Sequence, residues 1–462
     1  MILKINTFLI IWAFLVKGCY ATETQEDNFD LAIIGAGVSG VSHAYYLKKE
    51  NPNLKIALFE KDGHIGGKCF SYIDPQGRAH DMGSIEETAI HHVIRELADE
   101  AGIQRFPLIP IREENAAGYS CSSLSFLNSI WNYTRICNAH KVSESWNFVD
   151  FAEDTVRTMS LEQLIKTYDL EPMRIIFERA FRLYGYGQLD QIPAGIAFSY
   201  IDTELILANG MQKIPLLGKI YGMHRPLPTS LLQEGFQRIF QNLVVQMQDT
   251  PCPLQVFLNT KIDRIDSTDK GVIVQAGSQQ LWTARTAYVT SGWQHIVMPG
   301  IPQQVSEVFQ SLIHENYGTT VFKTVSSLPY EGIMDYRVQQ GLAPLMYGPK
   351  FSQDYSRRFG IAYAYGTPEQ GEEIFKALQS SLEKRGITVE GDQPLAQRQV
   401  TYNPRFPLQV IQKGVFQTLD YYQGTGNIFF GGAPLSFELT EAVAAFSKRM
   451  VPRIIQFFNK RP

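Results

Sequence analysis

The hydrophobic positions near the start of the chain follow a strand–helix–strand pattern. Residues 31–34 form a short apolar run that carries β-branched side chains, and a glycine-rich turn follows at 35–40. A helix-like segment then extends to about Lys49, and a second apolar run over 55–59 ends on Glu60. Because two short apolar strands flank one helix, this stretch predicts a βαβ unit and an α/β fold.

The turn between the first strand and the helix reads Gly35-Ala36-Gly37-Val38-Ser39-Gly40, which has the spacing of a dinucleotide-binding fingerprint. Its first glycine allows the tight turn, the second lets a pyrophosphate approach the backbone, and the third lets the helix pack against the sheet. The helix N-terminus then offers free N–H groups to the phosphates. Glu60 is placed to accept hydrogen bonds from a ribose diol, and it would repel a 2′-phosphate.

Two further motifs follow the fingerprint, Ile65-Gly66-Gly67-Lys68 and Asp81-Met82-Gly83-Ser84. Together with the fingerprint they resemble the extended FAD signature of the flavin-containing amine oxidase and phytoene desaturase superfamily. The resemblance implies FAD rather than NAD, held in a Rossmann-like (GR2-type) domain with an interleaved α+β substrate domain. The residues that it assigns to cofactor binding are Gly35, Gly37, Ser39, Gly40, Glu60, Lys61, Gly67, Lys68, Gly83, Ser84, Ile85, Ile262, Gly432 and Thr440.

Later segments extend the resemblance in the order that the superfamily has. The stretch 256–265 is similar to the strand whose backbone, at Ile262, binds the adenine. The segment 426–433 and the helix after it are similar to the last strand and final helix, whose N-terminus at Thr440 faces the flavin pyrimidine. Two positions depart from amine oxidases: Ala433 stands where an acid is usual, and only Phe437 represents the aromatic cage. The missing acid at Ala433, together with the segment Tyr72-Ile73-Asp74-Pro75, resembles the cyclopiazonate oxidocyclase branch of these flavoproteins.

No Cys follows Cys252 and no His follows His314, so we expect the flavin to be bound non-covalently. One candidate for catalysis is Lys323, which lies in an alternating segment over 317–325. In amine oxidases a lysine of the corresponding strand holds a water at the flavin N5. The alternative is that Lys323 is a solvated lysine without a catalytic role, and both interpretations stay open here.

The length of the chain indicates two interleaved domains after a leader. We predict an FAD-binding domain over 28–110, 226–300 and 400–462, and a substrate domain over 111–225 and 301–399. Within the substrate domain, four aromatic residues are candidates either to line the cavity or to fill the core: Tyr184, Tyr186, Phe198 and Tyr200.

Residues 1–21 have the form of a secretory signal, with Lys4 before an apolar run over 8–16. Plain export is expected, with a lipid anchor at Cys19 or an uncleaved N-terminal anchor as the weaker alternatives and no further membrane span. Four other cysteines leave either a Cys121–Cys137 disulfide or buried free thiols. A net charge of −4 gives no sign of a nucleic-acid partner, and no metal or Ser/His/Asp constellation is evident.

Three functions are compatible with this sequence. The first is an FAD oxidase of an amine, in which a hydride passes from a substrate carbon to flavin N5 and O2 is the expected electron acceptor. The second is a desaturase or oxidocyclase of an apolar polyene or prenylated substrate, which would not depend on Lys323. The third is a non-catalytic flavoprotein or NAD-binding module.

Overall fold

The computed structural model describes residues 28–88, 91–107, 112–114, 122–142, 146–203, 206, 230–329, 332–335, 345–347, 358–365 and 371–460. The predicted signal at 1–21 lies outside these residues, and so does Cys121. Among the described residues, no helix is long and apolar enough to cross a membrane. The same part of the chain contains no group of three or more His, Cys, Asp or Glu side chains that could hold a metal ion.

The first sheet has seven strands in the order β8-β2-β1-β11-β10-β9, with β17 paired to β11. β1 runs parallel to β2 and to β11, as the strand–helix–strand pattern predicts. The residues from Leu31 to Ile34 are buried between the layers that cover this sheet. The strands are β1 (Asn28–Ile34), β2 (Ile56–Phe59), β8 (Gln255–Phe257), β9 (Arg264–Thr268), β10 (Gly271–Ala276), β11 (Gln280–Val289) and β17 (Ile428–Phe430).

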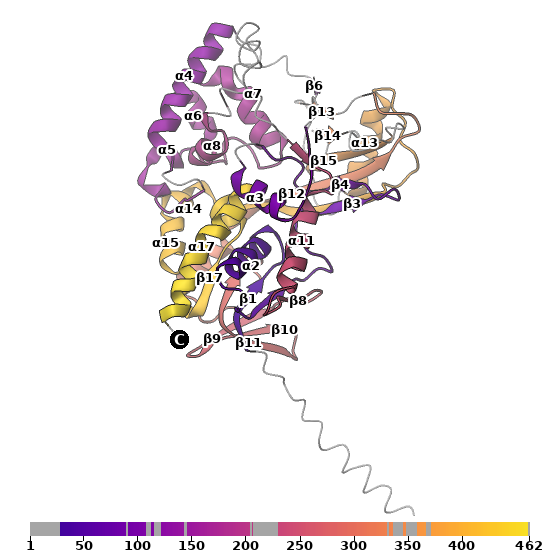
Figure 1. Cartoon of the computed structure of the whole chain (residues 1–462). Helices are drawn as coiled ribbons and strands as arrows, with labels where there is room; N and C mark the ends of the chain where they lie inside the picture. The colour runs from indigo at the N-terminus through magenta and orange to yellow at the C-terminus, as the bar shows by residue number, and fades with distance from the viewer. Residues whose placement is uncertain are drawn as a thin grey trace, which may run out of the picture.

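Helices cover this sheet, and α2 lies between α11 and α17 (Figure 1). Each of α11 and α17 has a buried apolar stripe at helical spacing, for example Phe236, Phe240 and Leu243 in α11. The helices of this layer are α2 (Val38–Glu50), α3 (His92–Glu100), α11 (Phe236–Gln248) and α17 (Thr440–Lys460). Shorter elements nearby are α12 (Gln303–Gln310), α14 (Leu408–Gln412), α15 (Val415–Tyr421), α16 (Ala433–Ser436), η7 (Thr425–Asn427) and the paired strands β5 (Arg105–Pro107) and β7 (Ser230–Leu232).

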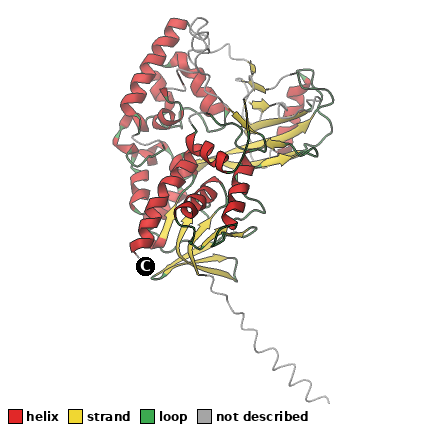
Figure 2. Cartoon of the chain, in the orientation of Figure 1, coloured by secondary structure: helices red, strands yellow, loops and turns green. Residues whose placement is uncertain are grey.

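The second sheet has six strands in the order β16-β12-β15-β14-β13-β6 and stands apart from the first (Figure 2). It is antiparallel except for the β13–β6 pair. The predicted domain limit at 399/400 falls inside β16, which pairs with β12 on both sides of that limit. The strands are β6 (Arg112–Glu114), β12 (Ile313–Lys323), β13 (Gly332–Asp335), β14 (Leu345–Tyr347), β15 (Phe359–Tyr365) and β16 (Ala396–Arg405), and α13 (Gly371–Glu383) packs on β12.

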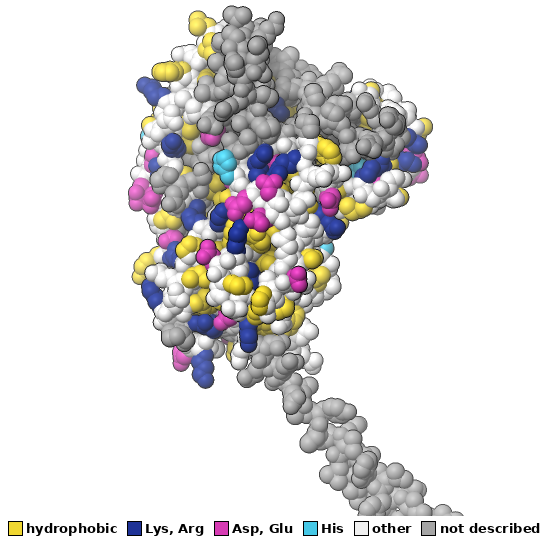
Figure 3. Space-filling view, in the orientation of Figure 1, with side chains coloured by type: hydrophobic (Ala, Val, Ile, Leu, Met, Phe, Trp, Pro, Cys, Tyr) yellow, Lys and Arg dark blue, Asp and Glu magenta, His cyan; other side chains and the backbone are white. Residues whose placement is uncertain are grey.

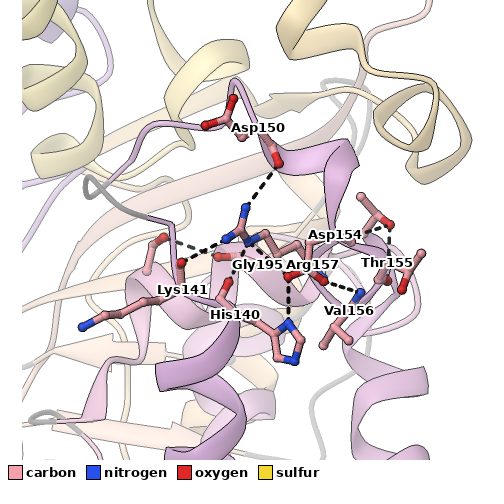
Figure 4. A network of polar contacts seen from close by, with 10 residues as sticks. His140, Lys141, Asp150, Asp154, Thr155, Val156, Arg157 and Gly195 are labelled. Atoms are coloured by element: carbon pink, nitrogen blue, oxygen red, sulfur yellow. Dashed lines mark hydrogen bonds and ion pairs between the residues drawn. The ribbon is translucent and has the colours of Figure 1, made fainter.

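A helical part lies beside the second sheet, and a polar network fixes two of its helices (Figure 4). Asp154 caps α5 by accepting hydrogen bonds from the backbone N–H of Val156 and of Arg157. Its other oxygen lies 2.7 Å from Nδ1 of His140, and Arg157 donates to the His140 carbonyl. The end of α4 is therefore tied to α5. The elements are α4 (Ser123–His140), η3 (Phe151–Glu153), α5 (Thr155–Thr158), α6 (Leu161–Thr167), η4 (Glu171–Met173), α7 (Arg174–Phe177), the π-helix η5 (Glu178–Leu183) and α8 (Ala194–Tyr200).

The two sheets meet at the segment 81–83, which follows the hairpin of β3 (Ser71–Ile73) and β4 (Ala79–Asp81). The Asp81 carboxylate accepts hydrogen bonds from Ser71 Oγ and from the Phe236 amide at the start of α11. On the other side, the Tyr363 hydroxyl donates to the Asp81 carbonyl, and Thr319 Oγ1 donates to the Met82 carbonyl at 3.1 Å. This segment thus joins the first sheet's helix layer to the second sheet.

Acidic and basic side chains lie side by side on the face shown in Figure 3. Pairs such as Lys49–Glu100 and Lys448–Glu96 connect α3 to α2 and to α17. Both pairs are exposed, so each contributes little to stability.

The state of the cysteines distinguishes the Cys121–Cys137 disulfide from buried free thiols, the two alternatives that the sequence leaves open. Cys69, Cys137 and Cys252 are free thiols. Cys137 is buried in α4 and its thiol donates to the Phe198 carbonyl at 3.6 Å. The structure therefore has a free thiol at Cys137 instead of the Cys121–Cys137 disulfide, and burial raises the pKa of this thiol to about 11, which makes it unreactive.

Candidate functional site: a dinucleotide cradle and an aromatic cluster

The predicted fingerprint forms the turn between β1 and α2. Gly37 is the N-cap residue of α2, and no side chain caps this helix end or adds an acidic group to its first turn. An uncapped N-terminus presents backbone N–H groups and the positive end of the helix dipole. Gly40 is needed here because a Cβ at this position would lie 2.0 Å from the Gly35 carbonyl. The turn therefore has the construction of an anion-binding site.

The second glycine pair closes this site from the other side. The Gly66 amide donates to the Ala36 carbonyl, and Gly37 and Gly66 form an isolated parallel bridge. Gly67 has φ +56°, and a Cβ on it would lie 2.8 Å from the Gly37 Cα. We call the backbone surface formed by residues 35–40 and 66–67 the dinucleotide cradle.

Glu60 lies at the end of β2 and is buried against the cradle. One carboxylate oxygen accepts a hydrogen bond from the Ala36 amide at 2.8 Å, and the other accepts from the Asp62 amide at 3.0 Å. These bonds hold the carboxylate beside the fingerprint turn, where a ribose would lie. The neighbouring Lys61 is exposed, and its role in cofactor binding stays a prediction.

Ser39 enters the site differently from its prediction as a cofactor ligand. Its side chain is buried, and Oγ lies 2.9 Å from Ser447 Oγ of α17 and 3.4 Å from the Tyr288 hydroxyl. The hydroxyl therefore joins α2 to α17, and a contact of Ser39 with the cofactor would come from its backbone amide in the first turn of α2.

Ile262 lies in the loop before β9 and its side chain is buried. Its neighbour Asp263 donates its amide to the Gln275 carbonyl, whereas the Ile262 backbone makes no hydrogen bond to another residue of the described chain. Backbone groups left open in this way fit the predicted contact with an adenine.

Residues far apart in the sequence meet beyond the cradle. Ser84 Oγ lies 2.6 Å from Thr440 Oγ1 at the first residue of α17. Lys68 Nζ lies 2.7 Å from a carboxylate oxygen of Glu438, and the Lys68 carbonyl lies 1.9 Å from where a Cβ on Gly83 would be. The predicted flavin-contacting residues are therefore brought together.

Two more cofactor candidates support this region. Gly432 has φ +96°, and a Cβ on it would lie 2.2 Å from the Thr290 carbonyl, so the turn before α16 requires glycine. Ile85 packs against a buried cluster that includes Tyr317 and Tyr363, and Tyr184 and Tyr402 pack against the same cluster. Arg398 of β16 also reaches the cradle, because its guanidinium donates to the Gly67 carbonyl at 3.0 Å. No motif or spacing in the sequence indicates this role of the arginine.

Aromatic side chains converge on Phe437, which has φ +94° and precedes α17. The ring centroid of Tyr186 lies 4.5 Å from that of Phe437 and 5.5 Å from that of Tyr402. Tyr402 in turn stacks on Tyr317 at 4.9 Å, and Tyr200 lies 5.8 Å from Phe437. We call these residues and Tyr184 the aromatic cluster: Tyr184, Tyr186, Tyr200, Tyr317, Tyr402 and Phe437.

The cluster supplies aromatic groups that the sequence around Phe437 lacks. Tyr200 and Tyr402 keep part of their surface accessible, although burial raises the pKa of both phenols. Side chains that are deep yet partly accessible are suited to contacting a bound molecule. Of the four aromatic candidates from the sequence, Phe198 packs instead on Tyr133 in the core.

Lys323 is not brought into this site. Its ammonium pairs with Glu390 at 2.9 Å, and both side chains are partly exposed. Thr319 contacts the Met82 carbonyl, and Lys323 lies four residues further along β12, which is roughly 13 Å at the rise of a strand. Lys323 therefore lies apart from the residues gathered at Ser84 and Thr440, its surroundings are those of a solvated lysine, and its role at the flavin N5 stays a prediction.

The residues present fit FAD. The cradle offers an uncapped helix end and glycines that a side chain would block, and Glu60 and the Ile262 backbone are the groups predicted to contact a ribose and an adenine. Beyond them, Ser84, Lys68 and Thr440 surround the place that the resemblance gives to the flavin.

Comparisons with known proteins agree with this fit. Residues 33–101 match the family described as an NAD(P)-binding Rossmann-like domain. Prenylcysteine oxidase 1 of Rattus norvegicus is 26% identical over 216 residues, which are 46% of this chain and 36% of that protein. Two solved structures are similar over nearly the whole chain. A CLA-producing fatty acid isomerase from P. acnes has a TM-score of 0.76 at 19% identity and covers 92% of this chain and 98% of that chain. Wild-type putrescine oxidase bound to putrescine has a TM-score of 0.65 at 16% identity, covering 93% and 99%.

These comparisons confirm the predicted fold class. The chain has the α/β fold of the FAD-dependent amine oxidase superfamily, with a Rossmann-like domain and an antiparallel second sheet. The predicted resemblance to FAD-dependent oxidoreductases of this superfamily is confirmed as well. The matched part spans only 15 to 36% of the length of the curated relatives.

Proposed function

We propose that the protein is an FAD-dependent oxidoreductase that holds its flavin non-covalently and oxidises a C–H bond of a largely apolar small molecule. The observation that carries the proposal is the position of the aromatic cluster, which reaches the Lys68–Glu438 pair through Tyr402. When bound, FAD supplies the hydride acceptor of the reaction.

The residues of this chain have separate tasks in that reaction. The cradle binds the pyrophosphate, and Glu60 accepts hydrogen bonds from the ribose. The positive end of the helix dipole at Thr440, the first residue of α17, would stabilise the negative charge of the reduced flavin. The aromatic cluster binds and orients the substrate and excludes water from it.

Two features favour an apolar substrate over an amine. Lys323 is distant from the site, and the second of the three functions does not need it. The side chains gathered at Phe437 are aromatic and present large apolar faces. The proteins similar to this chain include a prenylcysteine oxidase and a fatty acid isomerase, which supports the same choice.

Amine oxidation is the second candidate, because one observation favours it. Two carboxylates lie at the edge of the aromatic cluster: Glu438 pairs with Lys68, and Glu86 accepts a hydrogen bond from Tyr184. Carboxylates beside aromatic rings are suited to an ammonium group. O2 is the expected electron acceptor for either substrate.

The first test is the purified protein's flavin absorbance. Acid precipitation should release FAD into the supernatant, which would establish non-covalent binding. Under anaerobic conditions, polyenes or prenylated compounds should bleach the flavin and amines should not. Bleaching by amines alone would replace the apolar substrate with the second candidate, and a protein that FAD cannot reconstitute would refute the proposal. The variant Glu60→Ala tests the FAD site, and it should release more FAD than the parent when the protein is diluted.

We also propose that the chain is exported through residues 1–21. Expression of the full chain and of a chain that starts at residue 22, each fused to a reporter, tests this directly. Export of the first and retention of the second is the expected result, and retention of both would contradict the proposal.

A further inference from the structure

Glu86 follows closely on the segment that the resemblance places beside the flavin ring. It lies two residues after Ser84, whose hydroxyl contacts Thr440. The Tyr184 hydroxyl donates a hydrogen bond to Glu86 Oε1 at 2.6 Å. Tyr184 directly follows the π-helix η5, and short π-helical turns are frequent at functional sites.

The surroundings of Glu86 are aromatic. Burial is the main cause that raises the pKa of Tyr200 and of Tyr363, and the negative charge of Glu86 adds to it in both. The positive charge of Arg179 acts on Tyr200 in the opposite direction. The titratable groups that interact with Glu86 are therefore Tyr184, Tyr200 and Tyr363, and Arg179 is a charged group that interacts with Tyr200.

The next residue shows what a structural carboxylate looks like in the same loop. The Glu87 side chain is fully buried, pairs with Arg105 and lies 3.7 Å from Arg95. Glu86, by contrast, is partly accessible and forms no ion pair with a described residue. Its described partner is a phenol, which occupies Oε1 and leaves Oε2 open. Glu86 is thus a carboxylate that Tyr184 positions at the aromatic cluster, and its second oxygen is available to accept a proton.

We propose that Glu86 is the catalytic proton acceptor of the oxidation and that Tyr184 is its positioning residue, an inference that rests on the proposed function. In this step, a hydride with its two electrons leaves one substrate carbon for the bound FAD. A proton leaves the adjacent carbon for Oε2 of Glu86, and the electron pair of that C–H bond forms the new C=C bond. The substrate is oxidised by two electrons and the FAD is reduced by two. The carboxylate charge also stabilises the positive charge that develops on the substrate.

The test compares the parent with Glu86→Gln and Tyr184→Phe. The control is Glu307→Gln, which makes the same chemical change at an exposed residue of α12. Anaerobic flavin reduction by the substrate found above is followed over a range of pH. General-base catalysis typically contributes about 10²- to 10⁴-fold, so Glu86→Gln should slow reduction at least about 100-fold and remove its fall at acidic pH. Tyr184→Phe should slow it less and shift the pH profile, while Glu307→Gln should match the parent.

A second readout does not depend on activity. Ionisation of a carboxylate next to the flavin should shift the visible absorbance of the bound flavin with pH, and Glu86→Gln should abolish that shift. FAD affinity and melting temperature should stay within experimental error of the parent in Glu86→Gln. An unchanged reduction rate, or a spectral shift that persists in Glu86→Gln, would overturn the role of Glu86. If no substrate reduces the parent, the proposed function fails, while the spectral titration still decides whether Glu86 lies at the flavin.

Discussion

The dinucleotide cradle and the aromatic cluster adjoin at Lys68, whose ammonium lies 5.8 Å from the Tyr402 ring centroid. They are built in different ways. The cradle is a backbone surface from two nearby loops, and side chains would block it at Gly40 and Gly67. The cluster is a side-chain surface, with rings contributed by the loop after η5, α8, β12, β16 and the turn before α17.

This difference in construction determines which substitutions each region tolerates. A backbone site depends on local geometry, so almost any side chain at its glycines disrupts it whatever its chemistry. A side-chain site depends on the packing of distant segments, so ring substitutions alter shape and polarity while the fold persists. We expect the cradle to be uniform among proteins of this fold and the cluster to determine which substrate is accepted.

The largest effect should come from Gly67→Ala, because its Cβ would meet the Gly37 Cα inside the cradle. The matched control is Gly77→Ala: Gly77 also has positive φ, at +79°, but no atom lies within 4 Å of its Cβ position. Both variants pay a similar backbone penalty of about 1–2 kcal/mol. FAD affinity measured by fluorescence should fall at least tenfold in Gly67→Ala alone. Equal affinities in the two variants would show that the cradle is not where FAD binds.

An intermediate effect is expected at the joint between the two regions. Burial raises the pKa of Asp81 to about 7, although hydrogen bonds from Ser71 and the Phe236 amide lower it. Between about pH 4 and 7 the native chain therefore binds more protons than the unfolded chain, and its free energy of unfolding falls as pH rises through this window. Asn at this position keeps an oxygen for both hydrogen bonds. Asp81→Asn should equal the parent at pH 4 and exceed its stability by up to roughly 4 kcal/mol at pH 8.

Denaturant unfolding of both proteins across this range measures the difference directly. The difference in free energy of unfolding between the two proteins is compared, because an effect that both share then cancels. One such effect comes from buried His43, whose pKa burial lowers to about 4, so that it destabilises both proteins below about pH 6. A parallel pair of stability curves would mean that Asp81 is ionised throughout.

The smallest effect is expected from Lys323→Met, which tests whether the site ends where the structure places it. The Lys323–Glu390 pair is partly exposed, so its loss should change stability by about 0–1 kcal/mol. The rates of flavin reduction and of reoxidation by O2 in stopped flow should stay within twofold of the parent. A selective loss of reoxidation would return Lys323 to the flavin and favour the amine oxidase.

The contrast between the two regions also explains what the sequence could predict. The βαβ unit, the cradle glycines and Glu60 were predictable because each role follows from local spacing and backbone geometry. Ser84 and Thr440 were found through motif order alone, since nothing local shows that they meet. Tyr317, Tyr402 and Arg398 were missed because a residue on an antiparallel strand reveals its neighbours only when the register is known. The same lack of register allowed Lys323 to be assigned to the flavin.

Arg398 joins the second sheet to the Gly67 carbonyl, and its guanidinium also lies over the Phe70 ring. A ligand that fixes the cradle therefore fixes the strand that carries Arg398. By thermodynamic linkage, FAD at about 100 times its dissociation constant would stabilise the native chain by about 2.7 kcal/mol. The abundance of this protein should then follow the flavin supply of its host, with riboflavin starvation removing the chain by proteolysis as well as leaving it inactive.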